Sequence, residues 1–251
     1  MAILSRAVKV SLMGAIINIA KTTWLFFWAA LMSIILFVPM MIAALLSRTG
    51  NLAFTISKQW ARVMLFVTGT RVHIVNREKI RKGFCYVIIS NHQSQFDILA
   101  LVTSLGIQFR WVIKRELLKV PLFGWALYAA RNMFIDRGNH EKAISSIHRG
   151  VDRLPEGVSV LVFAEGTRSA DGRLGRFKKG GFMISVEKGI PLLPVAVKGS
   201  RKVLPKGSTA FQPGQIEVVV LDPIDPSGFS HDTIESLIET THGIIARELG
   251  R

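Results

Sequence analysis

A histidine and an aspartate that follow a predicted buried strand are the residues best placed to do chemistry. The apolar run at residues 84–90 is typical of such a strand, and the polar segment Asn-His-Gln-Ser-Gln-Phe-Asp follows it at residues 91–97. His92 and Asp97 would lie about 140° apart on a continuous helix, so a turn must bring them together. The carboxylate would then orient the imidazole, and the other ring nitrogen would act as a general base toward a substrate hydroxyl. The alternative is a histidine that only caps the next helix.

A second predicted buried strand, residues 159–164, leads into a segment suited to bind an anion. The sequence at residues 165–169 is Glu-Gly-Thr-Arg-Ser. Its glycine permits close approach to the backbone, its threonine and serine offer hydroxyl groups, and Arg168 presents a planar guanidinium that matches phosphate. The alternative is a solvated turn with an exposed arginine. Residues 168–206 favour the anion site, because they contain ten Lys and Arg and only two acidic residues.

The composition narrows the classes of partner. The chain has 251 residues, of which 49% are apolar, and a mean hydropathy of +0.36; these values exclude a disordered polyelectrolyte and predict that part of the chain lies in lipid. The net charge of +15 predicts anionic partners, such as acidic lipid headgroups, phosphorylated substrates or nucleic acid. Because no nucleic-acid-binding module is evident, we expect no nucleic-acid partner. With a single cysteine, Cys85, and five further histidines that lack ligand-like spacing, we also expect no metal site.

The first 69 residues predict a membrane anchor. Residues 24–46 carry no charge, and at about 1.5 Å per residue they are long enough to cross a hydrocarbon core of about 30 Å. Pro39 is tolerated in a membrane helix but also marks a place where the chain could bend back, so the sequence is compatible with one span and with a re-entrant hairpin. Residues 52–67 predict an amphipathic basic helix that lies either on the membrane interface or against the first helix.

The rest of the chain alternates between predicted strands and predicted helices. Strands are predicted at residues 71–75, 84–90, 109–113, 133–135, 159–164, 193–197 and 216–221. Helices are predicted at residues 96–105, 116–130 and 141–154, and a final helix begins near a capping box formed by Asp232 and Glu235. The alternation predicts the α/β class, with a mixed sheet flanked by helices and preceded by the apolar membrane-associating helical segment. We therefore expect a membrane-anchoring helical region at residues 1–69 and a catalytic α/β domain at residues 70–251.

Four segments together resemble the glycerolipid acyltransferase family. Asn91-His92-x-x-x-x-Asp97 and Phe163-x-Glu165-Gly166-Thr167-Arg168-Ser169 are similar to two of the family's motifs. Residues 133–137, Met-Phe-Ile-Asp-Arg, and residues 190–197, Ile-Pro-Leu-Leu-Pro-Val-Ala-Val, look like its second and fourth blocks. The resemblance extends over roughly residues 72–199. Each block alone is weak, but the combination is specific, and it resembles in particular the bacterial members that acylate 1-acyl-sn-glycerol-3-phosphate.

The resemblance implies a role for each matching residue. His92 would take the proton from the 2-hydroxyl of a lysophosphatidate, and Asp97 would orient the imidazole and stabilise its charge. Glu165 would position its loop, because a carboxylate beside a phosphate repels it. The residues that would bind the substrate phosphate are Arg168, Gly166, Thr167, Arg137 and Lys114. For Lys114 the alternative is an ordinary surface lysine.

The resemblance also implies substrates and a location. The acyl donor would be a thioester of coenzyme A or of acyl carrier protein, used as a co-substrate, and no cofactor would be needed. The acceptor would be the membrane lipid lysophosphatidic acid, and the product would be phosphatidic acid for phospholipid biosynthesis. The catalytic domain would face the cytoplasm at the inner, cytoplasmic membrane. The alternatives are the same chemistry on glycerol-3-phosphate or another lysolipid, hydrolysis of the thioester, and a non-catalytic membrane-bound protein that binds anionic ligands.

Overall fold

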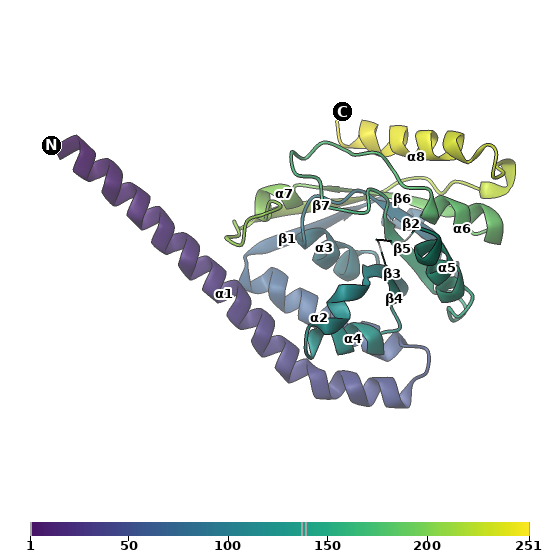
Figure 1. Cartoon of the computed structure of the whole chain (residues 1–251), viewed down its shortest axis with the longest axis horizontal. Helices are drawn as coiled ribbons and strands as arrows, with labels where there is room; N and C mark the ends of the chain where they lie inside the picture. Colours follow the sequence, from purple (N-terminus) through teal and green to yellow (C-terminus); the bar gives the residue numbers. More distant parts are fainter. Residues whose placement is uncertain (1, 137, 139, 251) are drawn as a thin grey trace.

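A mixed sheet lies at the centre of the computed structural model, which describes residues 2–136, 138 and 140–250 (Figure 1). The strands of the described chain follow the order β1 (Thr70–Val75), β7 (Gly214–Val220), β6 (Leu192–Lys198), β2 (Val87–Ser90), β5 (Ser159–Phe163), β3 (Phe109–Lys114) and β4 (Met133–Ile135). Every neighbouring pair is parallel except β6 and β7, which are antiparallel. The predicted α/β class with a mixed sheet is confirmed.

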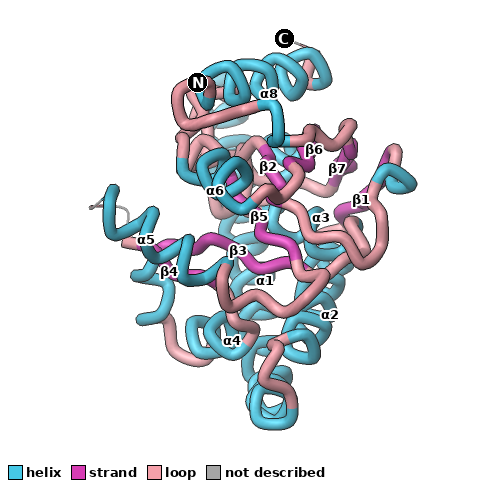
Figure 2. Tube along the Cα trace, turned by 90° about the vertical axis from the view of Figure 1, so that its right-hand side faces the viewer, coloured by secondary structure: helices cyan, strands magenta, loops and turns pink. Residues whose placement is uncertain are grey.

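Helices cover both faces of the sheet, and each face has its own apolar core (Figure 2). The helices of one face are α2 (Asn51–Val67) and α3 (Phe96–Ser104), and those of the other are α5 (His140–Val151), α6 (Gly180–Lys188) and α8 (Ile234–Glu248). The side chains of β2 alternate between the cores: Ile88 lies on the α3 face, whereas Val87 and Ile89 lie on the α6 face. All three are fully buried, as expected for a central strand covered on both faces.

The carboxyl ends of five adjacent strands share one edge of the sheet. β6, β2, β5, β3 and β4 all run in the same direction, and at this edge Ser90 of β2 is paired with Phe163 of β5. The polar segments at residues 91–97 and 165–169 therefore leave the sheet side by side. Ligands of open α/β sheets bind at this kind of edge.

The first two helices form an antiparallel hairpin. α1 (Ala2–Leu46) ends at a turn of residues 47–50, where Gly50 has a φ of +73°, a conformation that favours glycine. On the return, Trp24 Nε1 donates a hydrogen bond of 2.8 Å to Val67 O. α2 therefore lies against the first helix, which is one of the two placements that the sequence left open.

The chain does not reverse at Pro39. α1 continues through the proline to Leu46, and its segment Ser11–Leu46 is long and apolar enough to cross a membrane, by length and composition. The reversal at residues 47–50 comes after the proline, so a re-entrant hairpin that bends at Pro39 is not what the chain forms. The choice between a span and a hairpin that dips into one leaflet stays a prediction.

The second helix contributes to the same core as the sheet. Phe54, Ala61 and Met64 of α2 are buried together with side chains of β2 and α3. On its other side, Trp60 Nε1 donates to Ser33 Oγ of α1 at 3.2 Å. The division of the chain into two regions at residue 70 stays a prediction. α2 packs both on α1 and on the core of the sheet.

The predicted helix at residues 116–130 is interrupted. The structure has a 3-10 helix at Arg115–Lys119 and then α4 (Phe123–Ala129). Pro121 explains the break, because it has no N–H to donate and disfavours helical backbone in the residue before it. The next residue, Leu122, has a φ of +60°, and the chain turns there before α4 begins.

Two predicted starts of elements are also wrong. β2 begins at Val87 rather than at residue 84, and Phe84 is half exposed ahead of the sheet. α8 begins at Ile234 without a side-chain cap, so the capping box of Asp232 and Glu235 does not form. The helix starts too late for Glu235 to reach back, and its carboxylate pairs instead with Lys179 Nζ at 2.6 Å.

Candidate active site

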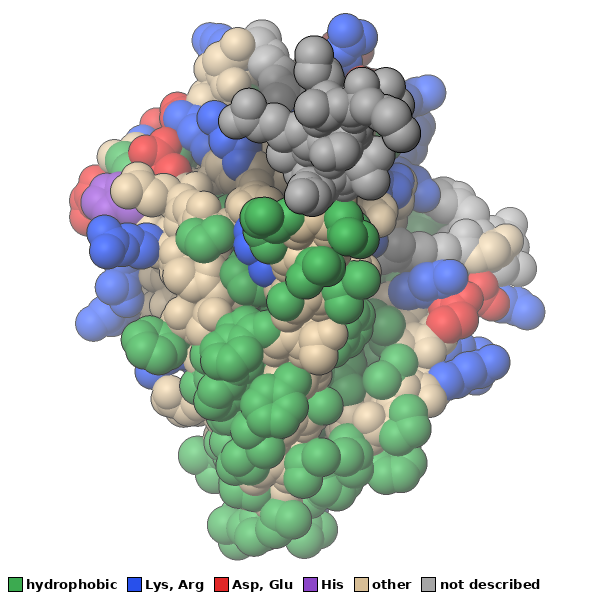
Figure 3. Space-filling view, turned by 90° about the vertical axis from the view of Figure 1, so that its left-hand side faces the viewer, with side chains coloured by type: hydrophobic (Ala, Val, Ile, Leu, Met, Phe, Trp, Pro, Cys, Tyr) green, Lys and Arg blue, Asp and Glu red, His purple; other side chains and the backbone are tan. Residues whose placement is uncertain are grey.

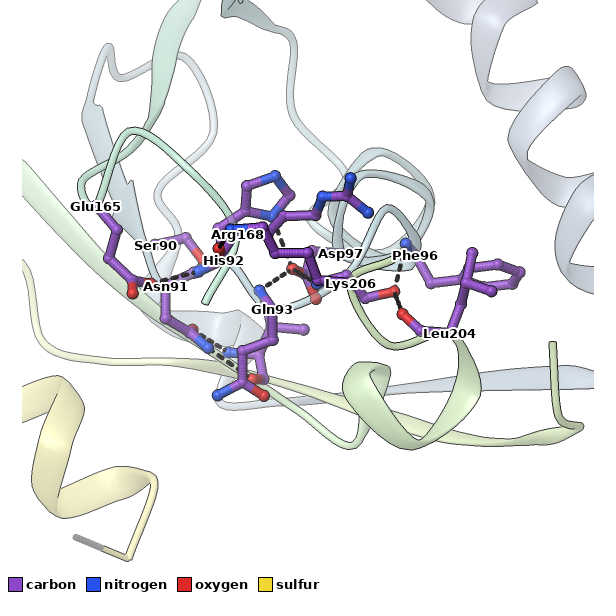
Figure 4. Close-up of polar contacts among 12 residues, drawn as sticks. Ser90, Asn91, His92, Gln93, Phe96, Asp97, Glu165, Arg168, Leu204 and Lys206 are labelled. Carbon is purple, nitrogen blue, oxygen red and sulfur yellow. Dashed lines mark hydrogen bonds and ion pairs between the residues drawn. The ribbon is translucent and has the colours of Figure 1, made fainter. Parts of the chain in front are cut away.

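A tight turn after β2 brings His92 and Asp97 together. β2 ends at Ser90 and α3 begins at Phe96, and between them His92 Nδ1 comes to 2.8 Å from Asp97 Oδ2 (Figure 4). The aspartate is completely buried, whereas 13% of the histidine side chain is exposed. The pair is thus oriented from inside the protein and open to a substrate on the side of the imidazole.

Three donors converge on one carboxylate oxygen. Asp97 Oδ2 accepts hydrogen bonds from the backbone N–H of Gln93 at 2.7 Å and of Ser94 at 2.8 Å, in addition to His92 Nδ1. Because this oxygen accepts, Nδ1 carries the proton in the neutral ring, and Nε2 keeps the lone pair. The arrangement therefore presents Nε2 as the basic nitrogen.

Two side chains within the turn hold it to distant parts of the fold. Asn91 Nδ2 donates to Val197 O at 2.9 Å, and Asn91 Oδ1 accepts from Val197 N at 2.8 Å, which joins the end of β2 to β6. Ser94 Oγ donates to Leu204 O at 2.7 Å. The sequence reasoning assigned no role to Asn91 or Ser94. Their place in a polar turn after a buried strand is the only local signal, because their partners lie more than 100 residues along the chain.

Glu165 joins the second predicted segment to the turn. Its Oε1 accepts the backbone N–H of His92 at 2.8 Å, and its Oε2 accepts the backbone N–H of Gly175 at 2.9 Å. In return, Ser169 N donates to His92 O at 2.8 Å. Both oxygens of this buried carboxylate accept hydrogen bonds from backbone N–H groups, and these bonds join the two loops.

The remaining residues of the Glu-Gly-Thr-Arg-Ser segment surround this contact. Gly166 has a φ of +71°, and a Cβ at this position would lie 2.9 Å from the Lys178 side chain, so a larger residue would strain the backbone and displace the lysine. Thr167 is exposed and Arg168 is half-buried. Figure 4 shows the Arg168 guanidinium on the same side of the site as the His92 imidazole. The structure thus places Arg168 beside the His-Asp pair, and Gly166 lies two residues before it in the same segment.

Two further phosphate-binding candidates are not brought into this group. Lys114 is half-exposed at the end of β3, where its Nζ lies 3.3 Å from Glu116 Oε1. It is on the carboxyl edge of the sheet, but its observed partner is the neighbouring glutamate. Arg137 lies outside the residues that the structure describes.

Stacked aromatic rings connect the histidine to an apolar cavity. The His92 ring lies on the Phe163 ring, with centroids 3.8 Å apart and planes inclined by 8°, and Phe163 stacks on Trp111 at 5.6 Å. Trp111 lines an apolar cavity that is partly open to solvent and whose walls also include Phe37, Met40, Phe54, Trp60 and Leu99. Sequence reasoning missed this connection, although Phe163 stood within the motif.

The structure describes no metal centre in the residues it covers: they contain no group of three or more His, Cys, Asp or Glu that could hold a metal ion. The two carboxylates nearest the imidazole are engaged in hydrogen bonds within the protein. Asp97 contacts the histidine itself, and Glu165 contacts backbone N–H groups. One edge of the sheet therefore presents an imidazole held by a carboxylate and, on the same side, an arginine.

Comparison of the sequence and the structure with known proteins shows the family to which the chain belongs. Residues 71–198, about half of the chain, match the family model described as Acyltransferase, and the chain belongs to this family. It is similar to the crystal structure of the 1-acyl-sn-glycerophosphate (LPA) acyltransferase PlsC from Thermotoga maritima, with a TM-score of 0.81 and 27% identity over 94% of this chain and 96% of that one.

Curated proteins from several kingdoms are also similar to the chain. A 1-acyl-sn-glycerol-3-phosphate acyltransferase of Pseudomonas aeruginosa is 36% identical over 65% of this chain and 64% of its own length. A chloroplastic 1-acyl-sn-glycerol-3-phosphate acyltransferase of Arabidopsis thaliana, LPAT1, is 33% identical over 68% of this chain and 48% of its own length. The matched regions span between 40% and 66% of the length of the curated relatives.

Proposed function

We propose that the protein transfers an acyl group from an acyl thioester to the 2-hydroxyl of 1-acyl-sn-glycerol-3-phosphate, forming phosphatidic acid. The observation that carries the proposal is the 2.8 Å contact between His92 Nδ1 and Asp97 Oδ2, which leaves Nε2 as the basic nitrogen. The relatives from Pseudomonas, Arabidopsis and Homo sapiens, each named as an acyltransferase for this acceptor, support the choice of substrate.

In the proposed reaction, the hydroxyl of the acceptor takes the place of a protein nucleophile. His92 Nε2 removes the hydroxyl proton while the oxygen attacks the carbonyl carbon of the thioester. Once the C–O bond has formed, the C–S bond breaks, and the donor thiol leaves with the proton that His92 returns. The Asp97 carboxylate stabilises the imidazolium between these two steps. The steps balance without a cofactor or a metal ion.

The charge and the shape of the site suggest where the phosphate and the hydrocarbon chain of the substrates would bind. Arg168 would bind the acceptor phosphate through its guanidinium, with Gly166 and Thr167 beside it and Glu165 holding the loop. Lys114 is a further candidate on the same sheet edge. A hydrocarbon chain would fill the cavity beside Trp111, because its walls are apolar. The stacked rings of Trp111 and Phe163 lead from this cavity to His92.

The N-terminal hairpin supports an association with the membrane. Figure 3 shows apolar side chains gathered over one face, with lysines and arginines beside them. Exposed apolar residues of α1, α2 and α4 include Phe26, Ile34, Leu45, Phe66, Trp125 and Tyr128. A lipid surface would bury this area and attract the flanking positive charge. We propose the cytoplasmic membrane as the site, with the catalytic edge facing the cytoplasm, where a thioester of coenzyme A or acyl carrier protein is supplied.

The test uses the full chain purified in detergent. A labelled long-chain acyl thioester, of coenzyme A or of acyl carrier protein, is incubated with lysophosphatidate, glycerol-3-phosphate, another lysolipid or no acceptor. The variants are His92→Ala, Arg168→Ala and, as a matched control, His73→Ala, whose histidine is exposed on β1.

Phosphatidate formed by wild type and by His73→Ala, but not by His92→Ala, would support the proposed activity. Arg168→Ala should raise the KM for lysophosphatidate through the loss of a charge-assisted hydrogen bond. Transfer to a different acceptor would keep the mechanism and change the substrate, and release of free fatty acid without any acceptor would identify a thioester hydrolase. Undiminished turnover in His92→Ala would remove His92 as the base.

A further inference from the structure

A lysine outside the four motif segments reaches the candidate site. Lys206 lies in the loop that follows the short helix α7 (Ser200–Val203), and its Nζ donates a hydrogen bond of 2.7 Å to Arg168 O. Figure 4 shows Lys206 beside Arg168. The loop that follows β6 thus places a second cation at the edge where β2 and β5 end.

The backbone that carries Lys206 is attached to the His-Asp turn. Leu204 O accepts from Ser94 Oγ at 2.7 Å, and Leu204 N donates to Ser200 O at 3.0 Å. Beyond the lysine, Ser208 N donates to Pro205 O at 3.2 Å, which closes a turn around it. The turn that orients His92 therefore also holds the backbone two residues before Lys206.

Within the described residues, no carboxylate neutralises the positive charge of Lys206 or of Arg168. In the residues that the structure covers, neither side chain forms an ion pair with a carboxylate. Glu165 is used by backbone donors, and Asp171 accepts from Ser169 Oγ and from Arg173 N. The ammonium of Lys206 has three donors, of which the carbonyl of Arg168 takes one. Two donors remain for the oxygens of a ligand.

We propose that Lys206 is a second phosphate-binding residue, and that together with Arg168 it makes the site select a phosphomonoester over a phosphodiester. The inference rests on the proposed function, because it concerns the headgroup of the same acceptor. A phosphomonoester carries about −1.5 to −2 near pH 7 and offers three terminal oxygens, whereas a phosphodiester carries a single negative charge and offers two. The two positive charges of Arg168 and Lys206 balance the charge of the phosphomonoester. A phosphodiester, with one negative charge, leaves one of them unbalanced.

The competing explanation is that Lys206 only supports the loop of Arg168 through its carbonyl. The two explanations differ in what happens to selectivity. If Lys206 is only a support, a neutral side chain that can donate to the Arg168 carbonyl, such as glutamine, should preserve the position of Arg168 and the preference. Loss of a charge that touches the phosphate weakens the dianion more than the monoanion.

The test measures binding of two probes that differ by one charge. Dodecyl phosphate and dodecyl methyl phosphate are titrated calorimetrically into the full chain in neutral detergent. The pH is about 7.5, at which the monoester is mostly dianionic. The variants are Lys206→Met and Lys206→Gln, which remove the charge, and Lys206→Arg, which keeps it. Lys202→Met is the matched control, because Lys202 is an exposed lysine of α7. Acyl transfer to lysophosphatidate is measured on the same preparations.

We expect the preference of wild type for the monoester to fall by about tenfold in both neutral variants, which corresponds to about 1.4 kcal/mol. It should be largely kept in Lys206→Arg and unchanged in Lys202→Met. A preference that is kept in Lys206→Gln and lost in Lys206→Met would overturn the proposal in favour of a loop support, as would an equal loss of affinity for both probes. An equal loss of preference in Lys202→Met would overturn it in favour of a general surface field. If the preference depends on Lys206 but no variant or wild type transfers an acyl group, the proposed function fails and this inference stands. If wild type transfers an acyl group but the preference does not depend on Lys206, the proposed function is supported and this inference fails.

Discussion

The imidazole of His92 lies flat on the phenyl ring of Phe163, with ring centroids 3.8 Å apart and an interplanar angle of 8°. Phe163 is the last residue of β5, and it stands opposite Ser90, the last residue of β2. One ring edge of the histidine is held by Asp97 and one ring face by Phe163. The other ring face and Nε2 contact neither of these two side chains.

Replacing Phe163 should lower turnover more than substrate affinity. In Phe163→Leu the imidazole loses a stacked partner, a contact worth about 1 kcal/mol, and gains rotational freedom about the Asp97 hydrogen bond. We expect kcat to fall by about tenfold with little change in KM for the acceptor. Phe163→Tyr keeps the ring and should restore most of the rate. Steady-state kinetics on the three proteins check this, and equal activity of the Leu variant and wild type would show that the stack has no part in orienting the base.

Replacing Asp97 by asparagine should abolish most of the activity while the chain still folds. Oδ2 accepts from His92 Nδ1 and from two backbone N–H groups, and an amide offers one oxygen to these donors and no negative charge. We expect kcat to fall by about 10²- to 10⁴-fold. Asp171→Asn, an exposed carboxylate in the loop beyond Arg168, is the control. Rates near wild type in Asp97→Asn would mean that the imidazole needs no carboxylate.

Arg110 should be a stability determinant of the N-terminal hairpin. This buried arginine of β3 donates to Thr49 O at 2.8 Å and to Asn51 Oδ1 at 2.5 Å, so it holds the turn between α1 and α2 against the sheet. Burial lowers the pKa of Arg110 to about 10, so the guanidinium is still charged at neutral pH.

Arg110→Met would leave these two oxygens without a donor, and we expect the free energy of unfolding to fall by about 3 kcal/mol. Thermal unfolding in detergent, followed by circular dichroism, measures the loss. Arg62→Met is the control, because this exposed arginine donates to Gln59 Oε1 of its own helix, α2, at 3.2 Å. A melting temperature unchanged by Arg110→Met would show that the turn is held by other contacts.

The thiol of Cys85 should react slowly. Burial raises the pKa of Cys85 above its ordinary value, and its Sγ contacts Val158 O at 3.1 Å. At pH 8 the folded protein therefore holds less thiolate than an unfolded chain, and its alkylation by iodoacetamide should be slower and should rise as the pH increases. Mass spectrometry of the native protein, with the urea-unfolded chain as reference, measures both rates. Faster alkylation of the native protein would contradict the assignment.

Local patterns in the sequence were sufficient for the class of fold and for the two reactive segments. The apolar runs predicted the central strands, and the polar residues after them predicted where chemistry would lie, because the carboxyl ends of parallel strands meet at one edge. The turn between His92 and Asp97 followed from their spacing, since a helix would have held them apart. Local patterns were wrong at Pro121 and at the start of α8, where a few backbone hydrogen bonds decide the boundaries.

Only the tertiary structure decided which distant residues complete the site. β2 lies between β5 and β6, and this strand order places Phe163 under His92 and joins Asn91 to Val197, 106 residues away. The same order brings Lys206 to Arg168. Residue periodicity specifies which face of a strand is buried but not which strand is its neighbour. The sequence by itself therefore determined the pair that could do the chemistry, and the packing of non-adjacent segments determined what surrounds it.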